Sequence, residues 1–388
     1  MKTIIKIAVS GCCQRGEFVD ECVSNSFDNR FQVNIVAGFD PNKDNLVKFA
    51  ERLSIKFDQR ANCYDDYEEM LDNEKLDAVF ITSPDYFHYE QAKLALEKNI
   101  HVFLEKPLAI SEEECHNLVQ IAHKSTAKIM VGHNLRYMPF IQKMHQIVRD
   151  GTIGKVVNIW VRHFISYGGD AFFKDWHAER EKCGSLLLHK GCHDIDAIHF
   201  LGNSYSNVVC AFGQQSLFNE LPKAKYQKQF FKAEDKQQRV NNWPPEEQQG
   251  FNSKLDVEDN CMMMMQLDNG IQCSYMQNNF TPDCSRNYTI IGTKGRIENF
   301  GNSAVHVYLN RTDNYSINGD EIFEFNEQEQ SHNFTNNLII RDFFDYIIYD
   351  KQPLVNLNDA FYSAISCIKG TQSMRNNGKR CEISAFRP

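Results

Sequence analysis

Two histidines and a carboxylate within one short segment are the residues best suited to proton transfer. The segment GSLLLHKGCHDIDAIHFLG, residues 184–202, contains His189, His193 and Asp196. On an α-helix these three positions share one face, and the near-neutral pKa of imidazole suits a general acid or base. The same His-x-x-x-His spacing also suits zinc, and a polar helix face packed under a loop would carry the same pattern.

A lysine at the end of an expected strand is the second candidate for chemistry. The segment SPDYFHYEQA precedes HVFLEKPLA, in which the expected strand HVFLE ends directly before Lys106. In a doubly wound fold, ligands bind at the carboxyl ends of the parallel strands. A solvated loop lysine is the alternative interpretation. We expect one ligand crevice to contain Asp85, His88, Glu105, Lys106 and Pro107. The residues expected to bind the cofactor here are Ser83, Pro84, His88, Glu105 and Lys106.

The N-terminal segment MKTIIKIAVSGCCQRGEF contains a turn that could hold a pyrophosphate. In a G-x-G-x-x-G turn the first glycine allows the bend, the second allows the phosphates to approach, and the third allows close helix packing. Gly11 and Gly16 hold the first and third places, whereas Cys13 holds the second and hinders the approach without excluding it. An ordinary strand-to-helix turn is the alternative. We expect a dinucleotide to contact Gly11, Cys12, Cys13, Gln14, Arg15 and Gly16.

Two further expectations follow from this turn. The positive end of the following helix should lower the pKa of the Cys12 or the Cys13 thiol. Asp40 ends the next expected strand, QVNIVAGF, where an acidic side chain accepts hydrogen bonds from the adenosine ribose. Asp40 would repel a 2′-phosphate, and the next residue is Pro41 rather than arginine. The sequence therefore favours NAD over NADP.

The elements that position these residues fall into two groups. Up to about residue 135, short apolar strands alternate with amphipathic helices, which predicts a parallel, doubly wound sheet. Residues 136–388 contain strands joined by hairpin turns, which predicts an α+β domain with a large, mainly antiparallel sheet. The polar composition of residues 219–254 predicts an inserted loop. We expect a C-terminal helix to pack back towards the N-terminal domain.

The composition favours a soluble, two-domain protein that binds a small molecule. At 388 residues the chain exceeds the size of a single core. The net charge of -9 argues against a nucleic-acid partner. The sequence contains no membrane-spanning apolar stretch, and Lys6 interrupts the N-terminal apolar run, unlike a secretion signal. Thirteen cysteines without CxxC metal pairs are typical of a reduced, cytoplasmic chain.

These segments together resemble the glucose-fructose oxidoreductase / inositol dehydrogenase / rhizopine-catabolism (Gfo/Idh/MocA) family. The resemblance rests on EKP at a strand end, on TSPDYFH before it, and on the histidine segment. Family members commonly have GG-x-L-x-D-x-x-x-H-x-x-D at the last of these places. His193 then matches the family's catalytic histidine and Asp196 its later acid, whereas His189 replaces the family's aspartate. The resemblance covers residues 3 to about 205, and is weaker through IIGTKGRIEN to the C-terminal helix.

The resemblance implies a Rossmann domain and hydride transfer between a nicotinamide and a CH–OH carbon of a sugar, sugar acid or cyclitol, without a metal. His193 would act as general base, Lys106 would stabilise the developing alkoxide, and neutral His189 would orient His193 without supplying charge. By the same resemblance, Arg136 would bind the cofactor. The substrate would be bound by Tyr137, Trp176 and His189. A homodimer or homotetramer would form through the C-terminal sheet.

Two other functions remain open at this point. A glycosidase of the same family would use NAD transiently, by oxidising the sugar, eliminating the aglycone and reducing the product. The altered His189 keeps this alternative open. A nucleotide-binding regulator without catalysis is the second alternative. Retention of both Lys106 and His193 argues against the regulator.

Overall fold

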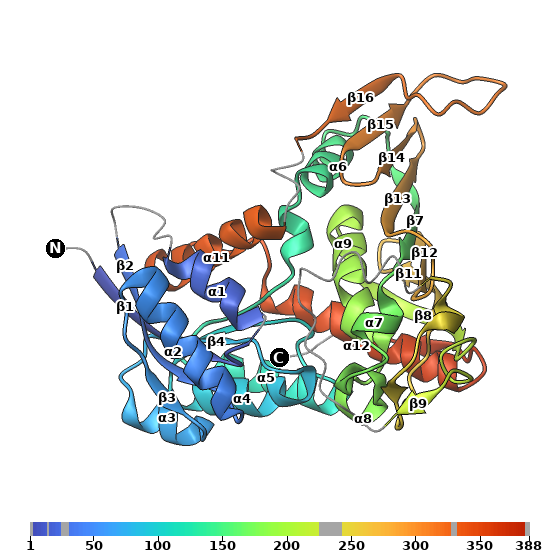
Figure 1. Cartoon of the computed structure of the whole chain (residues 1–388). Helices are drawn as coiled ribbons and strands as arrows, with labels where there is room; N and C mark the ends of the chain where they lie inside the picture. The colour runs from blue at the N-terminus through green and yellow to red at the C-terminus, as the bar shows by residue number, and fades with distance from the viewer. Residues whose placement is uncertain (1–2, 14, 25–30, 225–242, 327–331, 385–388) are drawn as a thin grey trace. The chain divides into compact units, whose positions relative to one another are not determined.

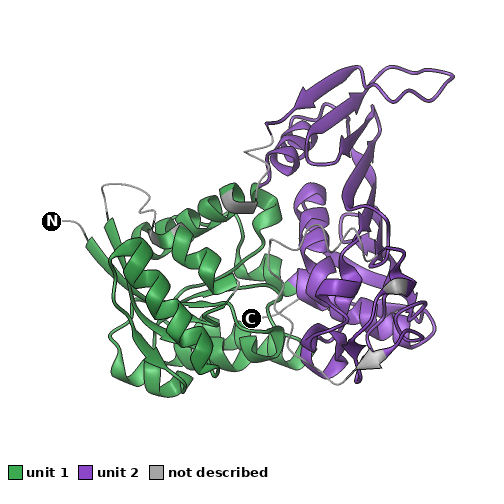
Figure 2. Cartoon of the chain, in the orientation of Figure 1, with its two compact units in different colours: residues 1–137, 331–361, 388 green, residues 138–330, 362–387 purple. Residues whose placement is uncertain are grey.

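The protein, described here by a computed structural model, consists of two compact units (Figures 1 and 2). The described residues are 3–13, 15–24, 31–224, 243–326 and 332–384. Unit 1 comprises residues 1–137, 331–361 and 388, and unit 2 comprises residues 138–330 and 362–387. The long helix α12 (Leu357–Arg375) therefore contributes residues to both units.

Six parallel strands form the sheet of unit 1, in the order β3-β2-β1-β4-β5-β6. The central strand β4, with the sequence AVFI, is buried at every position, as expected for a strand covered on both faces. The strand order reverses between β1 and β4, which is where such sheets bind ligands. The strands are β1 (Thr3–Ser10), β2 (Phe31–Phe39), β3 (Asn62–Tyr64), β4 (Ala78–Ile81), β5 (His101–Leu104) and β6 (Ile129–Val131).

The helices of unit 1 form two groups. Helix α1 packs against α2 and α11, whereas α4 packs against α3 and α5. Helix α11 comes from the C-terminal part of the chain, and its Phe343 lies 5.4 Å from the ring of Phe80 in β4 and 5.6 Å from that of Phe103 in β5. The helices are α1 (Arg15–Ser24), α2 (Lys43–Phe57), α3 (Tyr67–Asn73), α4 (His88–Glu97), α5 (Glu112–Lys124) and α11 (His332–Tyr349), with short turns η1 (Asp85–Phe87) and η2 (Asn134–Tyr137).

Nine strands form the sheet of unit 2, in the order β16-β15-β14-β13-β7-β12-β11-β8-β17. Every neighbouring pair is antiparallel except β7 and β12. The strands are β7 (Val156–Phe164), β8 (Ser206–Gln214), β11 (Asn260–Leu267), β12 (Gln272–Asn278), β13 (Ser285–Gly292), β14 (Arg296–Phe300), β15 (Ala304–Tyr308), β16 (Glu321–Glu324) and β17 (Cys381–Glu382). A second, two-stranded sheet joins β9 (Lys223–Ala224) to β10 (Phe251–Asn252).

Helices cover one face of the large sheet, as Figure 1 shows for α9 beside β7 and β12. Buried and exposed side chains alternate strictly along β11: Cys261, Met263 and Met265 are buried, whereas Met262 and Met264 are exposed. The opposite, open face of the sheet therefore carries the two exposed methionines of β11. The remaining elements of this unit are α6 (Pro139–Arg149), α7 (Gly168–Ala171), η3 (Trp176–Ala178), α8 (Arg180–Cys183), η4 (Leu187–Gly191), α9 (Cys192–Gly202) and η6 (Pro245–Glu247).

These sheets confirm the fold class predicted from the sequence. The parallel sheet has the strand order of a Rossmann fold, and the second sheet is large and mainly antiparallel. Residues 225–242, the middle of the predicted inserted loop, lie outside the described residues. Within the part of the chain that the structure describes, every helix is too short or too polar to cross a membrane.

Candidate active site

The glycine turn after β1 is built by very close backbone contacts. Gly11 has a φ of +86°, and a Cβ atom there would lie 2.8 Å from the backbone of Thr82 and Ser83. A Cβ atom at Gly16 would lie 2.2 Å from the carbonyl oxygen of Gly11. Gly11 therefore needs glycine for its backbone conformation, and Gly16 needs it for the packing of α1 against β1. This close-packed turn fits a dinucleotide pyrophosphate.

Cys12 and Cys13 differ in their exposure within this turn. Cys12 is 1% exposed, and its Sγ donates to the carbonyl oxygen of Phe39 at 3.4 Å. Burial, together with the nearby Asp40 carboxylate, raises the pKa of the Cys12 thiol well above its ordinary value. The prediction of a lowered thiol pKa is therefore wrong for Cys12, because burial outweighs the helix terminus. Cys13 is partly exposed, and Gln14 lies outside the described residues.

Asp40 holds the glycine turn and the start of α2 together. Its carboxylate accepts hydrogen bonds from the Cys12 backbone at 3.1 Å, the Asn42 backbone at 2.9 Å and the Asn45 amide at 3.0 Å. A carboxylate has about four acceptor positions. Among the described contacts, this arrangement leaves Asp40 one acceptor position for a ribose hydroxyl. The ribose contact itself stays a prediction.

Glu105 connects the glycine turn to the ends of β5 and β6. The distance between Arg15 Nε and Glu105 Oε1 is 2.5 Å, and the Glu105 side chain is 8% exposed. A Cβ atom at Gly132, after β6, would lie 3.3 Å from Glu105 Oε2. The same oxygen, Glu105 Oε2, accepts a hydrogen bond from the backbone N–H of Lys106 at 3.3 Å. Glu105 thereby fixes the backbone that carries Lys106.

Ser83 and His88 fix the loop that follows β4. The Ser83 hydroxyl donates to the Gln91 side chain at 2.7 Å. The His88 ring is 1% exposed, with Nε2 3.0 Å from the carbonyl oxygen of Ser83 and Nδ1 2.7 Å from that of Pro107. His88 therefore joins the loop that contains Pro84 to the loop that contains Lys106. Direct contact of Ser83, Pro84 or His88 with the cofactor stays a prediction.

Lys106 is partly exposed at the end of β5, near the fully buried His133. Burial lowers the pKa of His133 to about 3, and the charges of Arg136 and Lys106 act in the same direction. His133 is therefore neutral near pH 7 and adds no positive charge beside Lys106.

Arg136 and Tyr137 bind acidic side chains of the C-terminal part of unit 1. Arg136 is 3% exposed and donates to Asp359 at 3.0 Å. The Tyr137 hydroxyl donates to Asp342 at 2.6 Å. Both residues thus anchor η2 within unit 1. Their predicted contacts with cofactor and substrate stay predictions.

The histidine segment of unit 2 is not one continuous α-helix. Residues 187–191 form a π-helical turn that contains His189, and α9 begins only at Cys192. The prediction of one shared α-helical face is therefore wrong for His189, because a π turn contains more residues than an α turn. His189 and Asp196 are buried, and His193 is partly exposed. Among the described residues, no group of three metal-binding side chains could hold an ion.

Trp176 and His189 belong to one aromatic cluster. The Trp176 ring stacks on His177 at a centroid distance of 3.8 Å and meets His189 edge-on at 5.6 Å. The His177 and His189 rings are 4.7 Å apart, and Phe172 lies 5.6 Å from His189. The structure therefore brings together two of the predicted substrate residues of unit 2. A partly exposed tryptophan of this kind can stack on the apolar face of a sugar ring.

A buried ionic cluster is centred on Asp194, the residue that follows His193 in the sequence. The Asp194 side chain is fully buried, 3.0 Å from Arg286 Nε and 3.1 Å from His163 Nδ1, and it also accepts hydrogen bonds from Tyr275 and Tyr288. Burial alone would raise the pKa of Asp194, but Arg286 and His163 hold it well below its ordinary range. Burial and then Arg286 lower the pKa of His163 to about 4. Sequence analysis missed this cluster, whose members come from separate elements.

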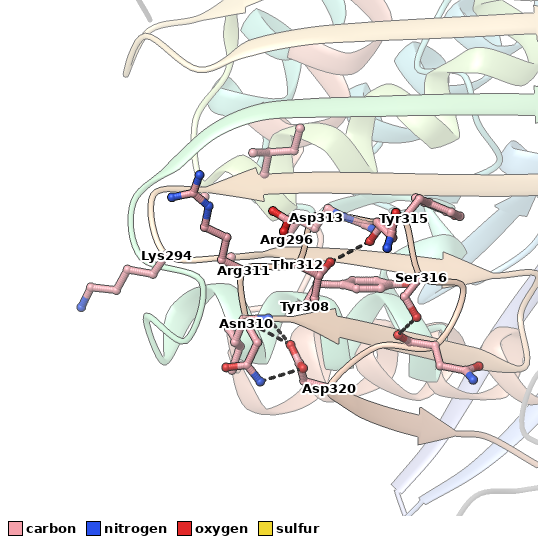
Figure 3. A pocket seen from close by; sticks show the side chains of 16 residues that line it. Lys294, Arg296, Tyr308, Asn310, Arg311, Thr312, Asp313, Tyr315, Ser316 and Asp320 are labelled. Atoms are coloured by element: carbon pink, nitrogen blue, oxygen red, sulfur yellow. Dashed lines mark hydrogen bonds between the residues drawn. The ribbon is translucent and has the colours of Figure 1, made fainter.

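An open cavity of about 650 Å³ lies beside β13, β14 and β15 (Figure 3). The Arg296 guanidinium lies 3.5 Å from the ring centroid of Tyr308, and Asp320 accepts hydrogen bonds from the backbone of Leu309 and Asn310. Figure 3 shows the Lys294 side chain extended away from the other lining residues. The lining contains no predicted site residue. We therefore assign no catalytic role to this cavity.

Comparison with known proteins covers almost the whole chain. Residues 5–133 match the family described as "Oxidoreductase family, NAD-binding Rossmann fold", and residues 145–382 match "Oxidoreductase family, C-terminal alpha/beta domain", the two domains of the Gfo/Idh/MocA proteins. Both domains are therefore matched in the order that the sequence predicts.

Individual relatives are more distant. The oxidoreductase YteT of Bacillus subtilis is 27% identical over 268 residues, which span 60% of this chain and 62% of YteT. The 2,7-anhydro-N-acetylneuraminate hydratase of Mediterraneibacter gnavus is 29% identical, over 43% of this chain and 42% of that protein. A levoglucosan dehydrogenase solved with NADH and levoglucosan has a TM-score of 0.79 at 18% identity, over 99% of this chain and 100% of the other. The chain thus spans less than two thirds of the sequence relatives, and the structural likeness shows the fold.

Proposed function

Because the chain belongs to the Gfo/Idh/MocA oxidoreductase family, we propose that it is an NAD-dependent oxidoreductase acting on a sugar, sugar acid or cyclitol. The observation that supports this most strongly is the glycine turn, in which a side chain at Gly11 would collide with the backbone of Thr82 and Ser83, and one at Gly16 with the backbone of Gly11. When bound, NAD supplies an acceptor for the hydride of a carbinol carbon. Gly11, Cys13, Arg15, Gly16 and Asp40 would hold it.

Two side chains of this protein would act on the substrate hydroxyl, one by accepting its proton and one by stabilising the charge left on its oxygen. His193 would accept its proton as general base, since an imidazole pKa lies near the operating pH. Lys106 would stabilise the negative charge that develops on the oxygen. Glu105 accepts a hydrogen bond from the backbone N–H of Lys106 and so helps to fix the chain that carries this lysine.

The reaction class can be tested with purified protein and a substrate panel. Nicotinamide absorbance is followed during incubation with polyols, sugar acids and aryl glycosides, with and without added NAD. Net reduction of NAD by a polyol or sugar acid supports the proposal. Release of an aglycone without net reduction supports the second candidate, an NAD-dependent eliminating enzyme. That candidate is favoured by His189 in place of the family aspartate and by the likeness to a hydratase.

We expect the protein to bind NADH at least about tenfold more tightly than NADPH, because the Asp40 carboxylate repels a 2′-phosphate. Asp40→Asn removes this charge but keeps the side-chain shape, so it should narrow the difference between the two cofactors. Titration by intrinsic fluorescence measures both affinities. Asp44→Asn, which changes an exposed carboxylate of α2, is the matched control. Tighter binding of NADPH by the wild type would contradict the assignment.

We also propose that copies of this chain associate through the open face of the large sheet. Phe212, Met262, Met264 and Trp160 are 65%, 64%, 70% and 47% exposed. The strand register places them on one face, since Met262 is opposite Phe212 and Met264 is joined through Ser274 to Trp160. Contiguous apolar surface on a sheet is typical of an interface, and a flat face can pair with the same face of a second copy.

The double variant Met262→Lys, Met264→Lys should lower the molar mass in solution to that of one chain. Like charges on both copies would then meet in a two-fold interface, and their burial would be unfavourable. Light scattering after size exclusion measures the mass. Ile55→Lys, at an 83% exposed apolar position of unit 1, is the control. An unchanged oligomer in the double variant would place the interface elsewhere.

A further inference from the structure

Tyr167 and Lys190 form a side-chain pair beside the aromatic cluster of unit 2. Lys190 directly follows His189 in η4, and its ammonium group hydrogen-bonds Tyr167. Lys190 Nζ lies 5.6 Å from the ring centroid of Tyr167 and 5.4 Å from that of Phe172. Phe172 in turn contacts His189. The pair therefore borders the residues that we assign to the substrate.

Close packing fixes the backbone that carries Tyr167. A Cβ atom at Gly168 would lie 2.2 Å from the carbonyl oxygen of Asn279, and one at Gly169 would lie 2.4 Å from the Gln248 side chain. The chain after Tyr167 therefore cannot shift without breaking these contacts. Tyr167 is itself partly exposed.

Positive charges dominate the surroundings of the Tyr167 hydroxyl. The groups that face it are Lys190 of η4, Arg286 of β13 and the Cys284 thiol. Lys190 and then Arg286 lower the pKa of Tyr167, although burial opposes them. Arg286 is bound to Asp194 at 3.0 Å, which makes Lys190 the stronger influence on the phenol. An adjacent cation stabilises the phenolate form.

We propose that Tyr167 is a second acid–base residue of the substrate site and that Lys190 positions it and sets its charge. This inference rests on the proposed oxidoreductase function. In the oxidation direction His193 takes the proton of the substrate O–H bond, and the N–H bond formed on His193 then breaks as the proton forms an O–H bond on the Tyr167 phenolate. The electron pair left on the substrate oxygen forms the C=O bond as the carbon loses its hydride, for which bound NAD⁺ would supply the acceptor. Reduction reverses both transfers, and Tyr167 returns the proton.

The presence of His189 in place of the family's aspartate is the reason to expect a second proton acceptor. The family's aspartate would stabilise a protonated His193, whereas a neutral His189 does not. A phenolate stabilised by Lys190 provides a proton acceptor whose charge is independent of His193.

The ionisation of Tyr167 can be measured without any substrate. Ultraviolet difference titration of tyrosinate in the wild type should show one tyrosine that ionises below the others. Tyr167→Phe should remove this step, Lys190→Met should move it to higher pH, and Lys190→Arg should restore it. Tyr205→Phe, at a tyrosine that stacks on Tyr362, is the control. Superimposable curves for the wild type and Tyr167→Phe would overturn the proposal.

The reaction found by the substrate panel supplies the second measurement. Oxidation requires the phenolate, so kcat/KM should rise with pH through the Tyr167 pKa. Tyr167→Phe should lower kcat/KM about 100-fold and remove this rise, whereas Lys190→Met should move the rise to higher pH. A wild-type pH profile in a folded Tyr167→Phe protein would refute the acid–base role and leave the proposed function intact. If no panel compound reacts, the proposed function fails, and the titration alone decides the ionisation of Tyr167.

Discussion

Replacing Lys106 by alanine is expected to lower turnover at least about 100-fold, and His193→Ala is expected to have an effect of similar size. Lys106→Ala removes the cation that stabilises negative charge on the substrate oxygen. His193→Ala removes the general base. Neither change touches the glycine turn or Asp40, so the affinity for NADH should stay within a few-fold of the wild type. Turnover with the substrate from the panel and fluorescence titration with NADH check the two parts separately.

Surface residues of the same types provide the controls. Lys98→Ala breaks an ion pair with Asp72 on the surface of unit 1, and His123→Ala changes an exposed histidine of α5. Both should retain wild-type turnover. Full activity of His193→Ala would show that the family's catalytic role does not carry over to this segment. Loss of NADH binding in Lys106→Ala would instead assign this lysine to the cofactor.

The nucleotide half of the fold could be predicted because its determinants are local. Gly11, Gly16 and Asp40 lie within one strand–helix–strand unit, and the distances that exclude a Cβ atom at both glycines agree with the roles expected from their spacing. The additional role of Asp40 could not be predicted. Its bonds to Cys12, Asn42 and Asn45 depend on how the turn and the start of α2 fold around it. The thiol prediction for Cys12 was wrong for the same reason, since burial is a property of the fold.

The substrate half was harder to predict because its contacts connect distant segments. The residue pattern of 184–202 indicates a helix, but the spacing of apolar residues does not reveal the π turn that contains His189. The pairing of Lys190 with Tyr167 crosses from η4 to the segment before α7. Asp194 looked like one more polar residue of the helix. Its importance depends on Arg286 of β13 and His163 of β7, which sequence spacing does not bring together.

Asp194→Asn is expected to lower the free energy of unfolding by about 3–5 kcal/mol, the usual cost of leaving one charge of a buried pair without its partner. Arg286 Nε lies 3.0 Å from Asp194, and the Asp194 side chain is fully buried. The asparagine amide also places a donor among groups that now donate to Asp194, including the Tyr288 hydroxyl. Urea denaturation measures the change, and Asp313→Asn, in the exposed loop after β15, is the control.

The pH dependence of stability separates this charge effect from a simple packing defect. The folded pKa of Asp194 is depressed, so its stabilising contribution is present above the unfolded value of about 3.9 and is lost as the pH falls through the lower folded value. Above pH 6.5 the full loss of unfolding free energy should therefore appear in Asp194→Asn.

His163 behaves differently, because its pKa falls from about 6.5 in the unfolded chain to about 4 in the folded one. Between these values the unfolded state binds the extra proton, and stability should fall by about 1.4 kcal/mol for each unit of acidification. His163→Gln should remove this slope while Asp194 still binds Arg286. A loss below about 1 kcal/mol in Asp194→Asn near pH 7 would show that Arg286 finds another partner, and that the buried ion pair does not hold β13 to α9.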